Sequence, residues 1–156
     1  MHSNRYTLIF TMVITIVLAF FLSLADSSLK EMRERNIEVD IRKNILSSLG
    51  FSSTDDLPWT NENVKTIFQN SIIGFVVDSS GSIIENKFPQ DIDPKVDFDL
   101  YPIYKRVTNN VTEGYSIPIS GKGLWGTMFG YFSIEADGAT AKGITFYKHI
   151  ETPGLG

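Results

Sequence analysis

The first strong pattern along the chain is an apolar run without a charged residue, from Tyr6 to Ala25. A helix of this length covers about 30 Å, which is the hydrocarbon thickness of a bilayer. We therefore expect a transmembrane helix over residues 6–25. A cleaved signal peptide is the alternative, because Ser23-Leu24-Ala25 offers small residues at a suitable spacing, although the run exceeds the usual length of about 7–15 apolar residues. The flanking charges are mixed and do not set the orientation.

The segment after the apolar run has the pattern of an amphipathic helix. Residues 26–50 are rich in charge at first, and their second half carries an apolar stripe at helical spacing, formed by Ile41, Ile45, Leu46 and Leu49. Gly50 is a natural C-cap, because glycine adopts left-handed backbone at little cost. We expect a juxtamembrane stalk helix that packs on the following domain. A face that binds a partner is the alternative.

Beyond residue 50 the pattern predicts one short helix and several strands, which together define an α+β fold. Residues 61–70 favour the helix. Runs of β-branched or alternating apolar residues predict strands over 72–77, 115–119, 127–134 and 143–150.

The connections between these elements carry their own signals. The turn Asp78-Ser79-Ser80-Gly81 predicts a hairpin that returns through residues 82–84. Pro118 marks the strand over 115–119 as an edge or a bulge. The segment 86–102 is rich in proline and aspartate, so we expect it to run over the surface.

The composition narrows the chemistry that this chain can perform. The net charge is −4, the basic residues are spread out, and the chain has no cysteine and two histidines. The lack of cysteine excludes disulfides, cysteine-ligated iron–sulfur clusters and thiol nucleophiles within this chain. Two histidines do not suit a multi-histidine metal or haem site, and we expect neither a metal nor a nucleic-acid partner. Redox chemistry would need an organic cofactor held by other groups.

Two glycine-rich segments are the strongest candidates for a binding site. The first lies between the strands predicted over 115–119 and 127–134, and its candidate residues are Gly121, Lys122, Gly123, Leu124 and Trp125. Glycines let a backbone approach a flat, phosphorylated cofactor closely. The spacing also fits G-x-G-x-x-G, but no helix follows, so this is not the dinucleotide-binding fingerprint. The alternative is a plain turn with Trp125 as a core anchor.

The second segment covers residues 151–156, and its candidate residues are Glu151, Thr152, Gly154 and Leu155. Its proline fixes φ and lacks an N–H, while its glycines allow positive φ. Such a segment leaves backbone N–H groups free for a ligand, although a simple turn after a strand is the alternative. His149 beside Glu151 is not expected to form an acid–base pair, and we predict no catalytic residue.

Together, Gly-Lys-Gly-Leu-Trp at 121–125 and Glu-Thr-Pro-Gly-Leu-Gly at 151–156 resemble the C subunit of the bacterial sodium-translocating NADH:quinone oxidoreductase. The resemblance implies an FMN-carrying electron-transfer subunit of the inner-membrane complex that oxidises NADH, reduces quinone and pumps sodium, with the other subunits as its partners. It implies a cytoplasmic N-terminus at residues 1–5 and an extracytoplasmic FMN-binding domain over 51–156. It also implies that both glycine-rich segments contact FMN, with Lys122 near negative charge.

The same resemblance implies that the FMN phosphate is attached to a threonine that follows the second segment. We therefore expect the domain to be incomplete at its C-terminus, to lack the attachment residue and to be inactive by itself. Asp137-Gly138-Ala139-Thr140 looks like the family's Gly-Ala-Thr attachment sequence, but it precedes the second segment and has Ile134 where the family has an aspartate. Thr140 is therefore not expected to carry the flavin.

Two other interpretations stay open. The G subunit of the Rnf electron-transport complex shares the anchor and the sequence at 151–156, and it is the Gly-Lys-Gly-Leu-Trp segment that favours the quinone-reductase family. The alternative from a different class is a membrane-tethered extracytoplasmic sensor of small ligands, because residues 72–84 resemble the strand–turn–strand of such domains.

Overall fold

The computed structural model describes residues 4–93, 96–152 and 154. The chain divides into two compact units, Met1–Glu38 and Val39–Gly156, and each is described by itself. Helix α1 (Asn4–Ser48) begins in the first unit and ends in the second. Within the described residues, α1 is long and apolar enough to cross a membrane by length and composition, properties that a signal sequence shares. It runs through residue 25 without a break, so the end of the membrane span stays a prediction.

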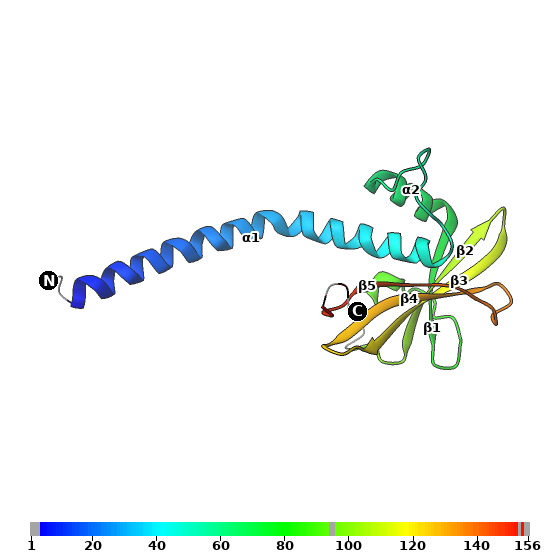
Figure 1. Ribbon diagram of the computed structural model, residues 1–156. Coiled ribbons are helices and arrows are strands. Elements are labelled where there is room, and N and C mark those ends of the chain that lie inside the picture. The colour runs from blue at the N-terminus through cyan, green and yellow to red at the C-terminus, as the bar shows by residue number, and fades with distance from the viewer. Residues whose placement is uncertain (1–3, 94–95, 153, 155–156) are drawn as a thin grey trace. The chain divides into compact units, whose positions relative to one another are not determined.

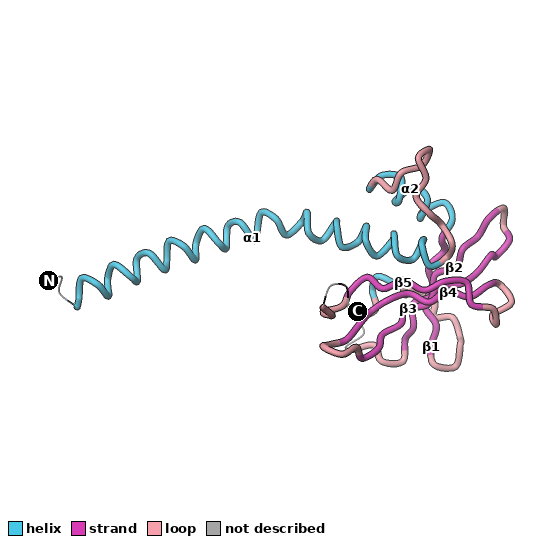
Figure 2. Tube along the Cα trace, viewed as in Figure 1, coloured by secondary structure: helices cyan, strands magenta, loops and turns pink. Residues whose placement is uncertain are grey.

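The second unit is built on a five-stranded antiparallel sheet in the order β1-β2-β3-β4-β5 (Figures 1 and 2). Helix α2 (Asn61–Ser71) leads directly into the first strand, and a short 3-10 helix, η1 (Pro89–Asp91), lies in the connection to the second. The strands are β1 (Ile72–Asp78), β2 (Leu100–Thr108), β3 (Val111–Lys122), β4 (Thr127–Glu135) and β5 (Ala141–Lys148). This architecture confirms the predicted α+β fold, with every strand next to its neighbour in sequence.

The hydrophobic core lies on one face of this sheet, where α2 and the last turns of α1 pack. The buried residues of this core are Ile45, Leu46, Leu49, Val64, Ile72 and Tyr131. The apolar stripe predicted for the end of α1 is therefore confirmed. Gly50 ends the helix at φ 85°, and the amides of Gly50 and Phe51 donate to the carbonyls of Ser47 and Leu46 in a Schellman motif.

A small polar cluster fixes the end of α1 against the middle of the sheet. The Ser48 hydroxyl donates to the Ile45 carbonyl at 2.8 Å, receives the Ser133 hydroxyl at 2.8 Å and lies 2.9 Å from the Ser116 hydroxyl. All three serines are buried. A Cβ at Gly143 would overlap the backbone oxygen of Ser48, so only glycine lets the helix approach β5 this closely.

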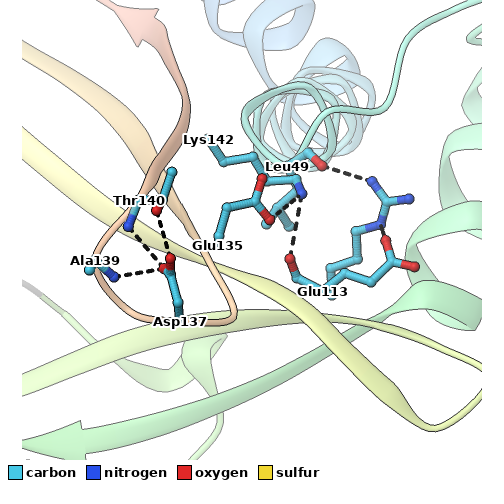
Figure 3. A network of polar contacts seen from close by, with 8 residues as sticks. Leu49, Glu113, Glu135, Asp137, Ala139, Thr140 and Lys142 are labelled. Atoms are coloured by element: carbon cyan, nitrogen blue, oxygen red, sulfur yellow. Dashed lines mark hydrogen bonds and ion pairs between the residues drawn. The ribbon is translucent and has the colours of Figure 1, made fainter.

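One basic side chain of the sheet donates to a carbonyl at the end of α1, and a second lies near the same helix end (Figure 3). Arg106 donates to the Leu49 carbonyl at 2.8 Å and pairs with Glu113 at 2.7 Å. Lys142 pairs with Glu135 at 2.9 Å. Positive charges near a helix C-terminus are attracted to the negative end of the helix dipole. Arg106 and Lys142 therefore stabilise the end of α1 on the sheet.

The structure corrects two predicted connections. The segment 86–102 was expected to stay on the surface, but its last three residues begin β2. Residues 82–84 were expected to form the second strand of a hairpin, yet only an isolated Val77–Ile83 bridge forms, and β1 pairs along its length with β2. The long-range partner prevails because the second strand of the local hairpin is too short to cover β1.

Both strand prolines lie where the sheet tolerates them. Pro102 pairs with Val76 of β1, but the pairing of β2 with β3 extends only from Tyr104 onward. Pro118 pairs with Tyr131 of β4, beyond the end of the β2–β3 pairing. Each proline thus sits in a stretch with a partner on one side only. The edge predicted at Pro118 is therefore local, because β3 is the central strand of the sheet and runs unbroken through this proline.

Candidate functional site

The two predicted glycine-rich segments lie against each other at one end of the sheet. We call residues 121–126 the glycine loop; it closes the β3–β4 hairpin. One oxygen of the Glu151 carboxylate, Oε1, accepts hydrogen bonds from the backbone amides of Trp125 at 3.0 Å and Gly126 at 3.3 Å. Within the loop, the Gly123 amide donates to the Gly126 carbonyl at 2.7 Å. The fold therefore joins segments that are far apart in the sequence.

The glycines of the loop were predicted to let the backbone approach a cofactor closely, and in the structure two of them closely approach side chains of the protein itself. Among the described residues, the glycines with positive φ are Gly50, Gly81, Gly138 and Gly154, so only the last belongs to the candidate site. A Cβ at Gly123 would overlap the Glu151 carboxylate, and a Cβ at Gly126 would overlap the Ile150 side chain. These two glycines leave room for the side chains of Glu151, in the second segment, and of Ile150, just before it.

The tip of the glycine loop presents apolar side chains to solvent. Leu124 is 84% exposed and Trp125 is 66% exposed, while Ile150 of the adjoining segment is 67% exposed. The alternative that made Trp125 a core anchor is therefore wrong. Large apolar side chains gathered at one exposed place typically mark a surface that another group covers.

Two basic residues lie at ends of strands near the glycine loop and Glu151. Lys122 is exposed at the last position of β3, directly before the tip of the glycine loop. Lys148, at the last position of β5, places its ammonium 5.5 Å from the centre of the Phe129 ring. The sequence prediction named Lys122 but missed Lys148 and Ile150. The signal that could have found them is their position shortly before Glu151, with Lys148 at the end of β5 and Ile150 just beyond it.

The remaining predicted site residues are Gly121, Thr152, Gly154 and Leu155. Gly121 is the residue of β3 that pairs with Met128, and Thr152 is exposed, as is His149. Gly154 adopts φ 83°. Leu155 lies outside the described residues. Among the residues that the structure describes, no group of three histidines, cysteines, aspartates or glutamates could hold a metal ion.

Thr140 follows the end of β4, while the glycine loop precedes its start. Figure 3 shows Thr140 beside Asp137. Its hydroxyl donates to the Asp137 carboxylate at 2.6 Å, and the amides of Ala139 and Thr140 donate to the same carboxylate at 2.9 Å each. These hydrogen bonds, that from the Thr140 hydroxyl above all, lower the pKa of Asp137 from 3.8 to about 2. Thr140 thus closes a tight turn, which supports leaving it outside the candidate site.

A comparison with known protein families finds a match over the C-terminal part of the chain. Residues 123–156, which begin in the glycine loop and include the second segment, match a family model described as FMN-binding domain. The matched class of domain is therefore a flavin-binding one, and the match includes most of the glycine loop and all of the second segment.

Relatives extend the similarity over the whole chain. It is 30% identical over 184 residues to the C subunit of the Na(+)-translocating NADH-quinone reductase of Pasteurella multocida, covering 100% of this chain and 69% of that relative. It is 28% identical over 178 residues to the C subunit of the same reductase of Pseudomonas aeruginosa, covering 99% of this chain and 67% of that relative. The chain belongs to the family of the C subunits of Na(+)-translocating NADH-quinone reductases.

Solved structures show the same fold. The C subunit of the Na(+)-translocating NADH-quinone reductase from Parabacteroides distasonis superposes with a TM-score of 0.68 at 26% identity, covering 81% of this chain and 61% of that one. Shewanella oneidensis NqrC gives a TM-score of 0.63 at 23% identity, over 79% of this chain and 63% of that one. The chain thus spans less than two thirds of these two proteins. Its family membership favours the NADH-quinone reductase interpretation over the Rnf G-subunit and sensor-domain interpretations.

Proposed function

We propose that this chain holds one FMN at the glycine loop and relays electrons within a membrane-bound NADH:quinone reductase. The observation that carries the proposal is the placement of the exposed Leu124 and Trp125 beside Glu151, within the segment that matches the FMN-binding family model. FMN is a flat apolar ring system joined to a phosphate, so it needs an aromatic or aliphatic surface next to a positive charge.

The described residues fit such a group. Leu124, Trp125 and Ile150 supply the exposed apolar surface for the ring. Lys122 and Lys148 supply the positive charge that a phosphate requires. Backbone amides of the second segment at Thr152 and Gly154, together with Leu155, complete the proposed contacts. Bound FMN supplies the one-electron chemistry, while the protein binds it, orients it and limits its exposure to water.

The proposal extends to the setting of the chain. Residues 6–25 anchor it in the bacterial inner membrane, with residues 1–5 in the cytoplasm, 26–50 as the juxtamembrane helix and 51–156 as the extracytoplasmic domain. Its partners are the other subunits of the sodium-translocating complex. The chain relays electrons between them, and by itself it does not oxidise NADH. The length of α1 supports the membrane anchor, and the names of the relatives support the assignment to a reductase complex.

The two tryptophans of the chain permit a direct test of the site. Trp59 packs against the core and Trp125 lies on the glycine loop, so the variants Trp59→Phe and Trp125→Phe each leave one reporter. The full-length chain in detergent micelles is titrated with FMN while tryptophan emission is recorded. We expect a blue shift and strong quenching of Trp125 in the Trp59→Phe variant, because stacking removes that indole from water.

The matched Trp125→Phe variant should show weaker quenching and no shift, because Trp59 is already shielded. Lys122→Ala should weaken FMN binding without changing the emission of the free protein. Equal responses from both tryptophans, or no response from Trp125 at saturating FMN, would contradict the proposed site.

A further inference from the structure

We propose that Glu151 is a positioning residue of the FMN site, which fixes the shape of the glycine loop and thereby presents Leu124 and Trp125. The claim that the fixed loop favours FMN binding rests on the proposed function, whereas the claim that Glu151 fixes the loop does not. It differs from the sequence prediction, in which Glu151 was one of the residues that touch FMN. In the structure, Glu151 Oε1 is engaged by the protein's own backbone.

The hydrogen bonds of Glu151 are of a kind that holds a loop in one conformation. Its carboxylate accepts from two consecutive amides, those of Trp125 and Gly126. Successive backbone N–H groups that converge on one point form an anion-binding concavity, and hydrogen bonds to an ionised group are stronger than neutral ones. The Gly123–Gly126 hydrogen bond closes the loop from the other side. The loop backbone is therefore held both from within and by Glu151.

The glycines of the loop show that its backbone and the residues around Glu151 pack tightly against each other. Any side chain at Gly123 would occupy the space of the Glu151 carboxylate, and one at Gly126 would occupy the space of Ile150. By contrast, a Cβ at Gly121 would meet no atom within 4 Å, although this glycine belongs to the same loop. At Gly121, where no neighbouring segment packs, a side chain would have room. At Gly123 and Gly126 the space that a side chain would need is filled by Glu151 and Ile150.

The position of this contact explains how Glu151 acts on the cofactor. Its two amide donors belong to Trp125 itself and to the next residue, while the side chains of Leu124 and Trp125 stay exposed. Fixing these amides fixes the direction in which both side chains leave the backbone. Glu151 would then raise FMN affinity by reducing the conformational freedom that the loop loses on binding.

The test compares Glu151→Ala with Glu151→Gln, which keeps an acceptor oxygen. Amide exchange of Trp125 and Gly126 is measured by NMR on the full chain in micelles without FMN, and FMN affinity is measured separately. In Glu151→Ala we expect both amides to exchange about tenfold faster or more, because hydrogen bonds to a charged acceptor are lost. We expect FMN affinity to fall about tenfold as well, and Glu151→Gln to restore most of both properties. Glu85→Ala, which removes an exposed carboxylate elsewhere, should change neither.

The outcomes separate the two proposals. Unchanged amide exchange in Glu151→Ala would overturn the positioning role, even if FMN affinity fell, because Glu151 would then act by touching FMN. Faster exchange with unchanged FMN affinity would also overturn it, because the loop conformation would not matter for binding. If the wild-type chain bound no FMN, the proposed function would fail. Faster amide exchange in Glu151→Ala, restored in Glu151→Gln, would still support Glu151 as the residue that orders the loop.

Discussion

At both ends of strands β3 to β5, glycines allow another segment to pack closely. One end is buried as a result, while the other leaves apolar side chains exposed. At the end where β4 finishes, Gly143 lies against the backbone oxygen of Ser48. At the end where β4 begins, Gly123 and Gly126 lie against side chains of Glu151 and Ile150. We call these the helix end and the loop end.

The helix end is closed. Its three serine hydroxyls are buried and hydrogen-bonded to one another, and the carbonyl of Leu49 is satisfied by Arg106. The loop end is open, since Leu124 and Trp125 remain exposed although the backbone beneath them is held. Glycine by itself therefore does not mark a binding site. What distinguishes the loop end is a fixed backbone that carries exposed apolar side chains.

The largest expected effect is at the helix end. Gly143→Ala should lower the free energy of unfolding by about 2–3 kcal/mol, because the new Cβ meets backbone that cannot move aside easily. Urea unfolding of the full chain in micelles measures the change. Gly121→Ala is the matched control, since a Cβ there meets nothing within 4 Å. Equal midpoints for the two variants would break the distinction between the ends.

A smaller loss is expected from the polar cluster beneath α1. Ser48→Ala removes the hydroxyl that links Ser116 to Ser133 and leaves their buried oxygens with fewer partners. The expected cost is about 1–2 kcal/mol in unfolding free energy. The neighbouring Ser47→Ala, at an exposed position, serves as the control in the same urea titration. A loss in Ser47→Ala as large as that in Ser48→Ala would show that the cluster adds nothing specific.

At the loop end we expect a change of function with little change of stability. Gly126→Ala places a Cβ against the exposed, flexible Ile150 side chain, so unfolding should cost less than about 1 kcal/mol. FMN affinity, measured by fluorescence titration, should nevertheless fall, because the two segments are pushed apart. A large loss of stability with normal FMN affinity would reverse the roles assigned to the two ends.

The smallest effect concerns the turn at the helix end that contains Thr140. The pKa of Asp137 is lowered to about 2 by the Thr140 hydroxyl and nearby amides. The turn is therefore stabilised by the ionised carboxylate above pH 3.8, and this stabilisation disappears as the pH falls toward 2. Amide exchange of Ala139 and Thr140 should accelerate over that interval. In Asp137→Asn the exchange of the same amides should follow only the intrinsic pH dependence of amide exchange. If the acceleration below pH 3.8 persisted in this variant, a group other than Asp137 would cause it.

The sequence predicted those parts of the fold that local pattern determines. The stripe at Ile45 and Leu49 indicated the buried end of α1 because its spacing matches one face of a helix. All of β2 (Leu100–Thr108) escaped prediction. Its first residues were assigned to a surface segment, because Pro102 and the aspartates before it are typical of one. A proline is compatible with a strand that pairs on one side only, and that condition depends on the sheet as a whole.

The sequence predicted both segments of the site but not the direct contact between them. Glycine content drew attention to both, yet the Glu151–Trp125 contact joins residues 26 positions apart and exists only once the β3–β4 hairpin and β5 are in register. The same limit explains why Trp125 could be interpreted as a core residue. Its size favours burial, and only the placement of the loop at the edge of the fold shows it exposed.

The most direct test of the central claim is a map of amide exchange in the full chain, with and without saturating FMN. The account predicts that FMN slows exchange in the glycine loop and in residues 149–152, while residues around Ser48, Ser116 and Gly143 at the helix end keep their rates. Slowed exchange confined to the helix end, or no change at the loop end while FMN is bound, would contradict the assignment of the loop end as the flavin site.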